Sequence, residues 1–321
     1  MELHSALNEV LGIRVPIVLA PMGGAAGAAL AGAVSSAGGL GLIGGGYADK
    51  DWVERELAAA DLSLVGVGFI TWSLRGREAV YERALERRPR ALFFSFGDPA
   101  AFLPAAKAAG AKVMCQVQTV ADAQRAAQLG ADVIVAQGAE AGGHGAARGT
   151  MALVPAVVDA VAPLPVLAAG GIADGRGIAA ALMLGAQGAV VGTRFLATPE
   201  ALIHANAKAR IVASSGDDTL RTRVFDIVRG RDWPKAYTGR AIRNAFTERW
   251  HGDEDGLAKA VQVEQPKFLA ALGRGDVDNG LIFAGEALDL IQGEMSAARI
   301  VEELVKETVA ALRGAANLVR P

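Results

Sequence analysis

The chain has 321 residues, of which 40 are glycine and 52% are hydrophobic, so it is too apolar to be disordered and can bury a full core. Its 32 basic and 34 acidic side chains nearly balance, which argues against nucleic acid or a membrane surface as a partner. Apolar runs end before ~18 residues, no signal sequence is visible, and the one cysteine, Cys115, cannot form an internal disulfide, which predicts a cytoplasmic protein without a membrane span.

Short aliphatic runs alternate with alanine-rich helical stretches over the first two-thirds of the chain. The runs lack period-two alternation, so we expect both faces to be buried, as in a parallel sheet covered by helices. Eight such units favour a (β/α)8 TIM barrel over an open doubly wound sheet. The predicted strands are residues 16–20, 40–43, 64–70, 91–95, 112–117, 132–136, 165–168 and 189–191, and the predicted helices are residues 25–37, 51–60, 77–87, 100–109, 120–129, 151–161 and 175–184.

This rhythm stops after about residue 205. Residues 206–273 are charged and predicted to be largely helical, and the Asp-Val-Asp-Asn-Gly sequence at 276–280 is typical of a turn. We therefore predict a barrel over residues 1–205, a helical insertion over the barrel mouth at 206–273, and C-terminal helices at 274–321 that return to the barrel.

In a barrel of this type, reactive groups gather in the loops after the carboxyl ends of the strands. After the first strand comes Ala20-Pro21-Met22-Gly23-Gly24, in which glycine lets a flat ligand approach the backbone. Paired glycine-rich loops after the seventh and eighth strands commonly bind a phosphate through main-chain N–H groups. A tight turn without a ligand is the alternative for the same glycines. The residues of these two loops include Ala169, Gly170, Gly171, Gly192 and Thr193.

His144 is the only histidine in these loops, and it follows Glu140-Ala141-Gly142-Gly143. Its glycine neighbours give no reason for a core role, and a neutral imidazole suits proton abstraction from a carbon acid or donation to a developing anion. Glu140 and His144 have no third ligand at a suitable spacing, so no metal site is predicted. Gln116 and Gln137 lie at strand ends, where an amide can hydrogen-bond a heteroaromatic ring, although glutamines that face solvent are the alternative.

A basic run lies in the predicted insertion. Residues 221–250 hold eight basic and three acidic side chains. Such a run is usually a solvated or ion-paired helical face. Over an active site it could also attract an anionic substrate, and the sequence leaves both interpretations open.

Together these loops resemble the nitronate monooxygenase family, formerly called 2-nitropropane dioxygenases, which is similar to the FMN-dependent enoyl-ACP reductases. The motifs are specific to this superfamily and do not separate its members. They are Ala20-Pro21-Met22-Gly23, Ala37-Gly38-Gly39-Leu40-Gly41, Glu140-Ala141-Gly142-Gly143-His144, the Ala-Ala-Gly-Gly-Ile-Ala-Asp-Gly sequence at 168–175, and Gly192-Thr193-Arg194-Phe195.

The resemblance implies non-covalently bound FMN, with His144 as the catalytic residue near flavin N5. Relatives often have Asn after the third strand, where this chain has Ile70-Thr71, so Thr71 is a candidate substitute for that contact. The implied cofactor contacts are Ala20, Pro21, Met22 and Gly23 at the isoalloxazine ring, Gln116 at its pyrimidine edge, Gln137 and Gly143 nearby, and Ala169, Gly170, Gly171, Gly192 and Thr193 at the phosphate.

The implied reaction begins with a nitroalkane that loses its α-proton to His144, or with a nitronate such as propionate 3-nitronate. FMN and O2 then convert it to a carbonyl compound and nitrite. Three alternatives stay open: an FMN-dependent NAD(P)H reductase of enoyl thioesters or quinones, a phosphosugar isomerase without flavin, and a flavin-binding protein with a decayed site. A small-molecule substrate is expected in the first two, and a homodimer is a candidate assembly.

Overall fold

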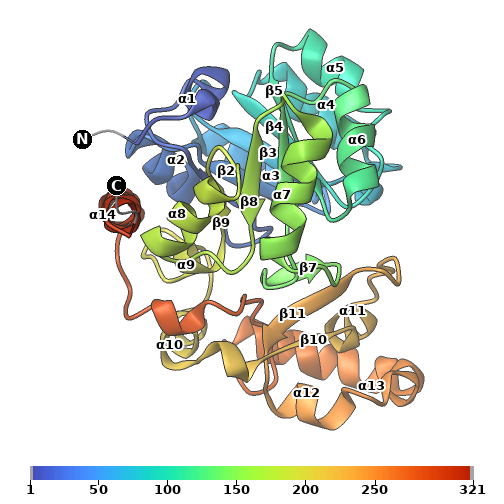
Figure 1. Cartoon of the computed structure of the whole chain (residues 1–321). Coiled ribbons are helices and arrows are strands. Elements are labelled where there is room, and N and C mark those ends of the chain that lie inside the picture. Colours follow the sequence, from blue (N-terminus) through green and yellow to red (C-terminus); the bar gives the residue numbers. More distant parts are fainter. Residues whose placement is uncertain (1–2, 319–321) are drawn as a thin grey trace.

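The computed structural model describes residues 3–318, so the outer ends of the predicted ranges 1–205 and 274–321 lie outside the described residues. Eight parallel strands form one sheet in the order β1-β9-β8-β6-β5-β4-β3-β2 (Figure 1). A parallel bridge between Val18 and Leu40 joins the two edges, so the predicted TIM barrel is confirmed. The strands are β1 (Ile17–Leu19), β2 (Leu42–Gly46), β3 (Gly66–Ile70), β4 (Ala91–Ser95), β5 (Lys112–Val117), β6 (Val133–Gln137), β8 (Val166–Ala169) and β9 (Ala189–Val191).

Helices surround this barrel on its outer side. The last helix of the ring is α14 (Ala297–Ala316), which follows the insertion in the chain and packs against α8 and α2 (Figure 1). The C-terminal segment therefore completes the layer that the first two hundred residues leave open. The other helices of the layer are α2 (Ala28–Ser36), α3 (Lys50–Ala59), α4 (Glu78–Glu86), α5 (Leu103–Ala108), α6 (Val120–Gln128), α7 (Thr150–Val161) and α8 (Gly175–Met183).

The barrel interior is filled from its N-terminal end by a short helix that the sequence patterns did not reveal. Leu7 and Leu11 of α1 (Ala6–Leu11) are buried against inward-facing strand residues such as Phe93 and Met114. Burial of these side chains closes the bottom of the barrel and stabilises it through the hydrophobic effect. The opposite end, where the strands finish, is left for the loops.

Gly41 lies directly before β2 and allows helix α2 to approach the chain closely at that point. A Cβ at Gly41 would overlap the carbonyl of Ala31, so we expect Gly41→Ala to destabilise the protein by about 3 kcal/mol. A Cβ at Gly32, within the same helix, meets no atom within 4 Å, and Gly32→Ala is expected to stabilise it by up to ~1 kcal/mol. Urea unfolding of both variants measures these changes in stability. Equal unfolding midpoints for the two variants would contradict the close approach of Gly41 to Ala31.

The insertion differs from the expected largely helical segment because it also contains two strands. β10 (Thr219–Thr222) and β11 (Thr238–Ile242) pair antiparallel, and β11 pairs with β7 (Gly143–Gly145), which belongs to the loop after β6. This three-stranded sheet joins the insertion to the barrel mouth (Figure 1). Short, polar or glycine-rich strands give little periodic signal, which explains why the sequence did not predict them. The remaining α-helices are α9 (Thr193–Leu196), α10 (Ala205–Ala213), α11 (Val224–Val228), α12 (Ala245–Trp250) and α13 (Glu254–Gly273).

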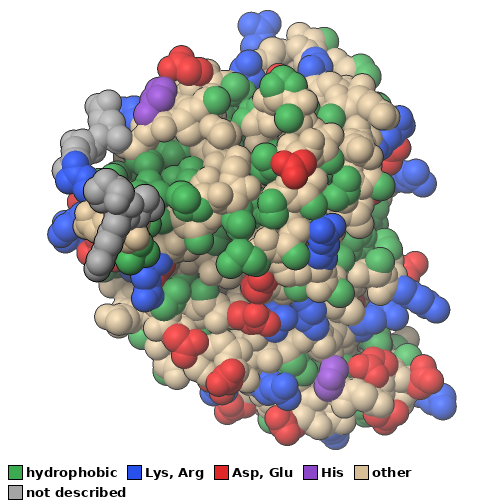
Figure 2. All heavy atoms as spheres, viewed as in Figure 1, with side chains coloured by type: hydrophobic (Ala, Val, Ile, Leu, Met, Phe, Trp, Pro, Cys, Tyr) green, Lys and Arg blue, Asp and Glu red, His purple; other side chains and the backbone are tan. Residues whose placement is uncertain are grey.

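The visible surface is uneven in character. Charged side chains gather over the insertion, in the lower part of Figure 2, whereas apolar side chains are more frequent over the barrel helices. Met151 of α7 and Met183 of α8 are the most exposed methionines of that apolar region, at 69% and 73%. Within residues 3–318, no helix combines the length and the apolarity needed to cross a bilayer.

Candidate active site

The carboxyl ends of the barrel strands open into a cavity of about 740 Å3, bounded on its far side by the insertion, which we call the mouth cavity. Its volume is in the range of cofactor and small-molecule sites. Every residue selected from the sequence for catalysis or cofactor binding lines it, although these residues belong to five different barrel strands and the segments that follow them. They are Ala20, Pro21, Met22, Gly23, Gln116, Gln137, Gly143, His144, Ala169, Gly170, Gly171, Gly192 and Thr193.

Two glutamines place a donor and an acceptor at the wall of the mouth cavity. Gln116 Nε2 and Gln118 Nε2 both donate to Gln137 Oε1, over 3.0 and 2.8 Å. Gln137 Nε2 and Gln116 Oε1 then have no hydrogen-bond partner among residues 3–318. A flavin pyrimidine edge carries C=O and N–H groups side by side, so this pair complements it.

The loops after β8 and β9 bring main-chain atoms to another end of the cavity. Gly170 and Gly171 have φ of 102° and 71°, in the left-handed region that favours glycine. The Thr193 hydroxyl oxygen accepts a hydrogen bond from Gly285 N at 3.0 Å, which leaves its own proton free for a ligand. Within residues 166–196 no Lys or Arg lines the cavity, so a phosphate here would depend on main-chain N–H groups and this hydroxyl.

Leu281, Ile282, Phe283, Gly285 and Ala287 also line this region, and the sequence interpretation missed them. Gly142 and Gly285 approach so closely that a Cβ on Gly142 would lie 2.6 Å from Gly285 N, and one on Gly285 would lie 2.9 Å from Gly142 N. The available signal was weak, because it consisted of Gly285 after an apolar run. The contact brings together two loops that lie more than a hundred residues apart.

Two polar side chains hold the loop that carries Gly142 and Gly143. The Glu140 carboxylate accepts hydrogen bonds from Thr150 N at 2.9 Å and from Thr150 Oγ1 at 2.8 Å. Arg221 of β10 donates to Ala139 O at 2.9 Å, and burial lowers the pKa of its guanidinium to about 10. Glu140 is therefore engaged as a loop anchor. No three side chains of His, Cys, Asp and Glu cluster within residues 3–318 as a metal ion would require.

His144 lies in strand β7, opposite Gly239 of β11, rather than in an irregular loop as expected. Its side chain is buried, and its Nε2 lies 3.0 and 2.9 Å from the two carboxylate oxygens of Asp226. Asp226 comes from α11, is only 3% exposed, and also accepts a hydrogen bond from Arg229 at 2.9 Å. The sequence interpretation missed Asp226, because nothing local connects it to a histidine 82 residues away.

Aromatic rings enclose the imidazole of His144. Trp233 stacks on it with a centroid distance of 3.5 Å and an interplanar angle of 5°, and Phe283 meets it edge-on at 5.4 Å. Trp233 Nε1 donates to the Tyr47 hydroxyl at 2.7 Å, which fixes the indole. Phe96 also packs against Trp233, at 4.9 Å, although its φ of 59° is costly for a bulky residue. These contacts restrict rotation of the imidazole.

The electrostatic surroundings keep His144 neutral at pH 7. Burial lowers its pKa from 6.5, and this effect exceeds the opposing influence of Asp226, which raises the pKa through a hydrogen bond and its charge. The positive charges of Arg229 and Arg221 lower it further. A neutral imidazole retains one nitrogen lone pair, as a general base requires.

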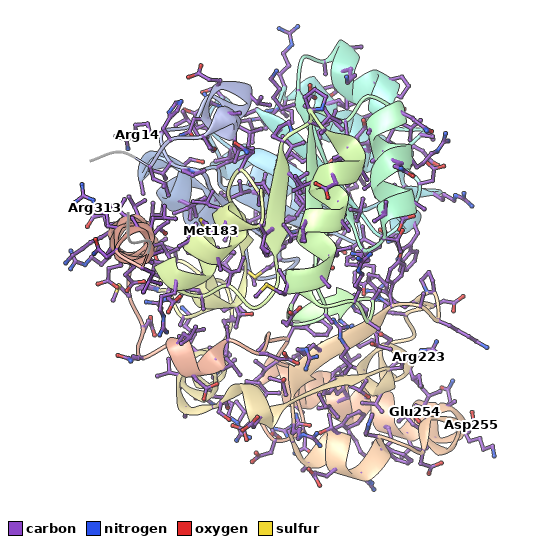
Figure 3. The ribbon with its side chains drawn as sticks, in the orientation of Figure 1. Arg14, Met183, Arg223, Glu254, Asp255 and Arg313 are labelled. Carbon is purple, nitrogen blue, oxygen red and sulfur yellow. The ribbon has the colours of Figure 1, made fainter. Side chains whose placement is uncertain are left out.

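Most basic residues of the insertion do not line the mouth cavity. Arg229 and Arg231 line it, and Arg229 is paired with Asp226. The Arg231 guanidinium lies 4.3 Å from the Tyr47 ring centroid and has no carboxylate partner among the residues described. Figure 3 shows Arg223 at the outer side of the insertion. Arg231 is thus a cation available to an anionic ligand at the cavity.

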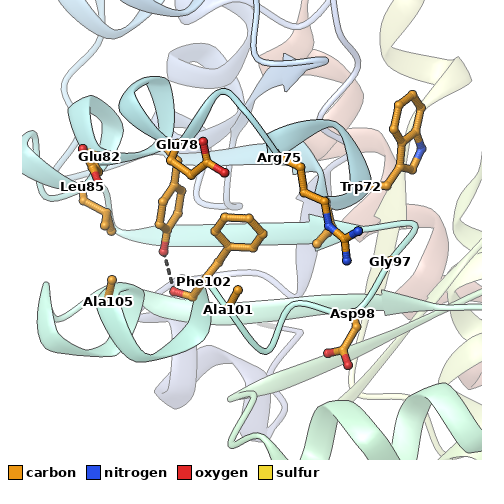
Figure 4. A pocket seen from close by; sticks show the side chains of 12 residues that line it. Trp72, Arg75, Glu78, Glu82, Leu85, Gly97, Asp98, Ala101, Phe102 and Ala105 are labelled. Carbon is orange, nitrogen blue, oxygen red and sulfur yellow. Dashed lines mark hydrogen bonds between the residues drawn. The ribbon is translucent and has the colours of Figure 1, made fainter.

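A second cleft of about 470 Å3 lies outside the mouth cavity, between α4 and α5 (Figure 4). Thr71 lines this outer cleft and is not among the residues that line the mouth cavity. Thr71 therefore lies apart from the other candidate cofactor contacts, and its role as a substitute for the asparagine contact stays a prediction. Strand β3 ends one residue before Thr71, at Ile70, and Ile70 does line the mouth cavity.

A family model described as nitronate monooxygenase matches residues 4–63 and 74–307, which include the barrel loops, His144 and the insertion. The chain belongs to the nitronate monooxygenase family. It is accordingly an oxidoreductase enzyme, as the sequence resemblance predicted. The match extends through the insertion that supplies Asp226 and Trp233.

Individual relatives of this nitronate monooxygenase family member carry different names. A nitronate monooxygenase of Neurospora crassa is 34% identical, over 91% of this chain and 88% of the relative. A (3aS,4S,5R,7aS)-5-hydroxy-7a-methyl-1-oxo-octahydro-1H-indene-4-carboxyl-CoA dehydrogenase of Mycobacterium tuberculosis is 30% identical, over 99% of this chain and 100% of the relative. The structure of FabK from Thermotoga maritima has a TM-score of 0.86 and 30% identity, over 99% and 100% of the two chains. Membership of the family thus leaves the substrate open.

Proposed function

We propose that the protein is an FMN-dependent nitronate monooxygenase, which oxidises alkyl nitronates or nitroalkanes with O2 to carbonyl compounds and nitrite. The observation that carries the proposal is the buried, neutral His144 beside Asp226, in a cavity that also offers a flavin-type donor and acceptor at Gln137 and Gln116. Membership of the family and the 34% identity to the Neurospora crassa enzyme support it. A cytoplasmic location and a homodimer stay predictions from the sequence.

The residues that line the mouth cavity fit FMN. Gln137 and Gln116 complement the pyrimidine edge, and small residues after β1 leave room for a flat ring against the backbone. When bound, FMN supplies the electron acceptor that the reaction needs. The proposed set is Ala20, Pro21, Met22, Gly23 and Gly143 at the ring and Ala169, Gly170, Gly171, Gly192 and Thr193 at the phosphate.

The protein's own part in the reaction begins with a proton. With a nitroalkane, the α-C–H bond breaks, the electron pair stays on the nitronate, and the proton moves to the imidazole of His144. A preformed nitronate needs no such transfer. Arg231, which has no carboxylate partner among residues 3–318, favours an anionic substrate such as propionate 3-nitronate.

The test is an anaerobic stopped-flow comparison of reductants for the flavin in the holoenzyme. We expect propionate 3-nitronate to bleach the flavin bands within the turnover time, whereas NADH and NADPH do so far more slowly. Readmission of O2 after nitronate should then release nitrite. Rapid bleaching by NADH with no response to nitronates would refute the proposal and favour the reductase.

A second candidate is oxidation or reduction of a CoA or other thioester by the same flavin. It is favoured by the 30% identity to the Mycobacterium tuberculosis CoA-thioester dehydrogenase along the full length of both chains, and by Arg231 at the cavity. Enoyl-CoA and acyl-CoA compounds added to the same stopped-flow experiment separate it from the first candidate. Nitrite release without any response to thioesters would exclude it.

A further inference from the structure

The catalytic histidine is held by an acid that belongs to another part of the fold. His144 is part of β7, in the loop after β6, whereas Asp226 is in α11 of the insertion. The Asp226 carboxylate faces one ring nitrogen only, with both oxygens within 3.0 Å of Nε2. No hydrogen-bond partner of Nδ1 occurs among residues 3–318.

This geometry selects one tautomer of the imidazole. An ionised carboxylate can only accept hydrogen bonds, so a neutral imidazole beside it places its proton on Nε2. Nδ1 then keeps the lone pair. Arg229 Nη2 donates a second, charge-assisted hydrogen bond to Asp226 Oδ1, at 2.9 Å.

Packing prevents the ring from taking another orientation. Trp233 covers one face of the imidazole at 3.5 Å, and the edges of Phe283 and Phe96 lie at centroid distances of 5.4 and 6.4 Å. A flip of the ring about the Cβ–Cγ bond would put Cε1 in the place of Nε2 and break the contact with Asp226, inside a site that is almost fully buried. Loss of that contact would leave the Asp226 charge with Arg229 alone.

We propose that Asp226 is a positioning residue, which holds His144 as the Nε2–H tautomer and so presents Nδ1 as the proton acceptor. This proposal rests on the proposed function, in which His144 removes the α-proton of a nitroalkane. As that proton arrives at Nδ1, the Asp226 carboxylate stabilises the imidazolium through the Nε2–H hydrogen bond. The insertion thereby completes the catalytic pair as well as covering the cavity.

The surrounding groups define the pH dependence that follows. The charged groups that face His144 are Asp226 of α11, Arg229 directly after that helix, and Arg221 of β10. Tyr47 and Tyr237 each pack against Trp233, and burial raises the pKa of both hydroxyl groups, so both tyrosines stay neutral over the working pH range. Removal of the Asp226 charge removes an influence that raises the His144 pKa, so the pKa falls further.

The decisive variant is Asp226→Asn, with Asp232→Asn as the control because Asp232 is exposed in the same insertion. We expect Asp226→Asn to lower kcat/KM for nitroethane by about 100-fold, since the tautomer is no longer imposed. Turnover of preformed ethyl nitronate should change by less than about threefold, because no proton is removed. The acid limb of the nitroethane pH profile should move to lower pH, whereas Asp232→Asn leaves profile and rates unchanged.

Nitrogen NMR of 15N-histidine-labelled holoenzyme gives a readout that does not depend on activity. The His144 resonances, assigned by their loss in His144→Gln, should show Nε2 protonated and Nδ1 unprotonated at pH 8. The Nδ1–H tautomer in the unsubstituted protein would overturn the proposal, even if Asp226→Asn failed to fold. Equal losses with nitroethane and ethyl nitronate would also overturn it. Absence of any nitronate turnover in the unsubstituted enzyme would instead reject the proposed function.

Discussion

Replacement of His144 by glutamine is expected to reduce kcat/KM for nitroethane by about 10²- to 10⁴-fold, the usual contribution of a general base. Glutamine has no basic nitrogen, but its amide can still donate a hydrogen bond to Asp226. Turnover of preformed ethyl nitronate should stay within about tenfold, because the bond that His144 breaks is already broken. Steady-state nitrite release from both substrates measures the effect.

The pH profile of the unsubstituted enzyme adds a second check on this residue. His144 acts as a base only when neutral, and burial lowers its pKa below 6.5. Above neutral pH, His144 is already unprotonated, so its titration should not affect the turnover of nitroethane. The turnover should fall as the pH drops through the lowered pKa of His144. His251→Gln is the matched control, since His251 is exposed and lies outside the cavity lining. A similar loss for His251→Gln, or for both substrates with His144→Gln, would contradict a role in proton transfer.

Introduction of an aspartate at Gly192 is expected to weaken FMN binding by about 100-fold relative to an asparagine at the same position. Gly192 has a φ of −113°, and a Cβ there would meet Ala20 Cβ at 3.4 Å and Met22 Sδ at 3.6 Å, so both side chains are tolerated. At a separation of ~5 Å, a carboxylate and a phosphate repel each other by about 3 kcal/mol per unit charge at an effective dielectric constant near 20. Titration of the apoprotein with FMN, followed by flavin fluorescence, gives the two dissociation constants.

Riboflavin, which lacks the phosphate, separates charge repulsion from misfolding in this comparison. Gly192→Asp and Gly192→Asn should bind riboflavin with similar dissociation constants, because no phosphate is present to repel. An equal difference between the variants for FMN and for riboflavin would place the phosphate elsewhere. Circular dichroism of both variants establishes that each is folded.

The sequence by itself determined the barrel, because its strands are local features. A parallel strand buried on both faces is a short continuous apolar run, and β4 and β5 coincide with residues 91–95 and 112–117 as predicted. The loop glycines were equally visible, since Gly170 and Gly171 have φ values that favour glycine. His144 was recognisable as the one histidine in a strand-end loop.

The tertiary structure decided everything that depends on contacts between distant parts of the chain. The partner of His144, the covering Trp233 and two strands of the three-stranded sheet all come from residues 219–242, which no local pattern connects to residue 144. Helix α14 joins the barrel after the insertion. Periodicity reports which residues are buried, but it does not report what they are buried against. The sequence therefore indicated where His144 lies, whereas its tautomer depends on a carboxylate placed by the fold.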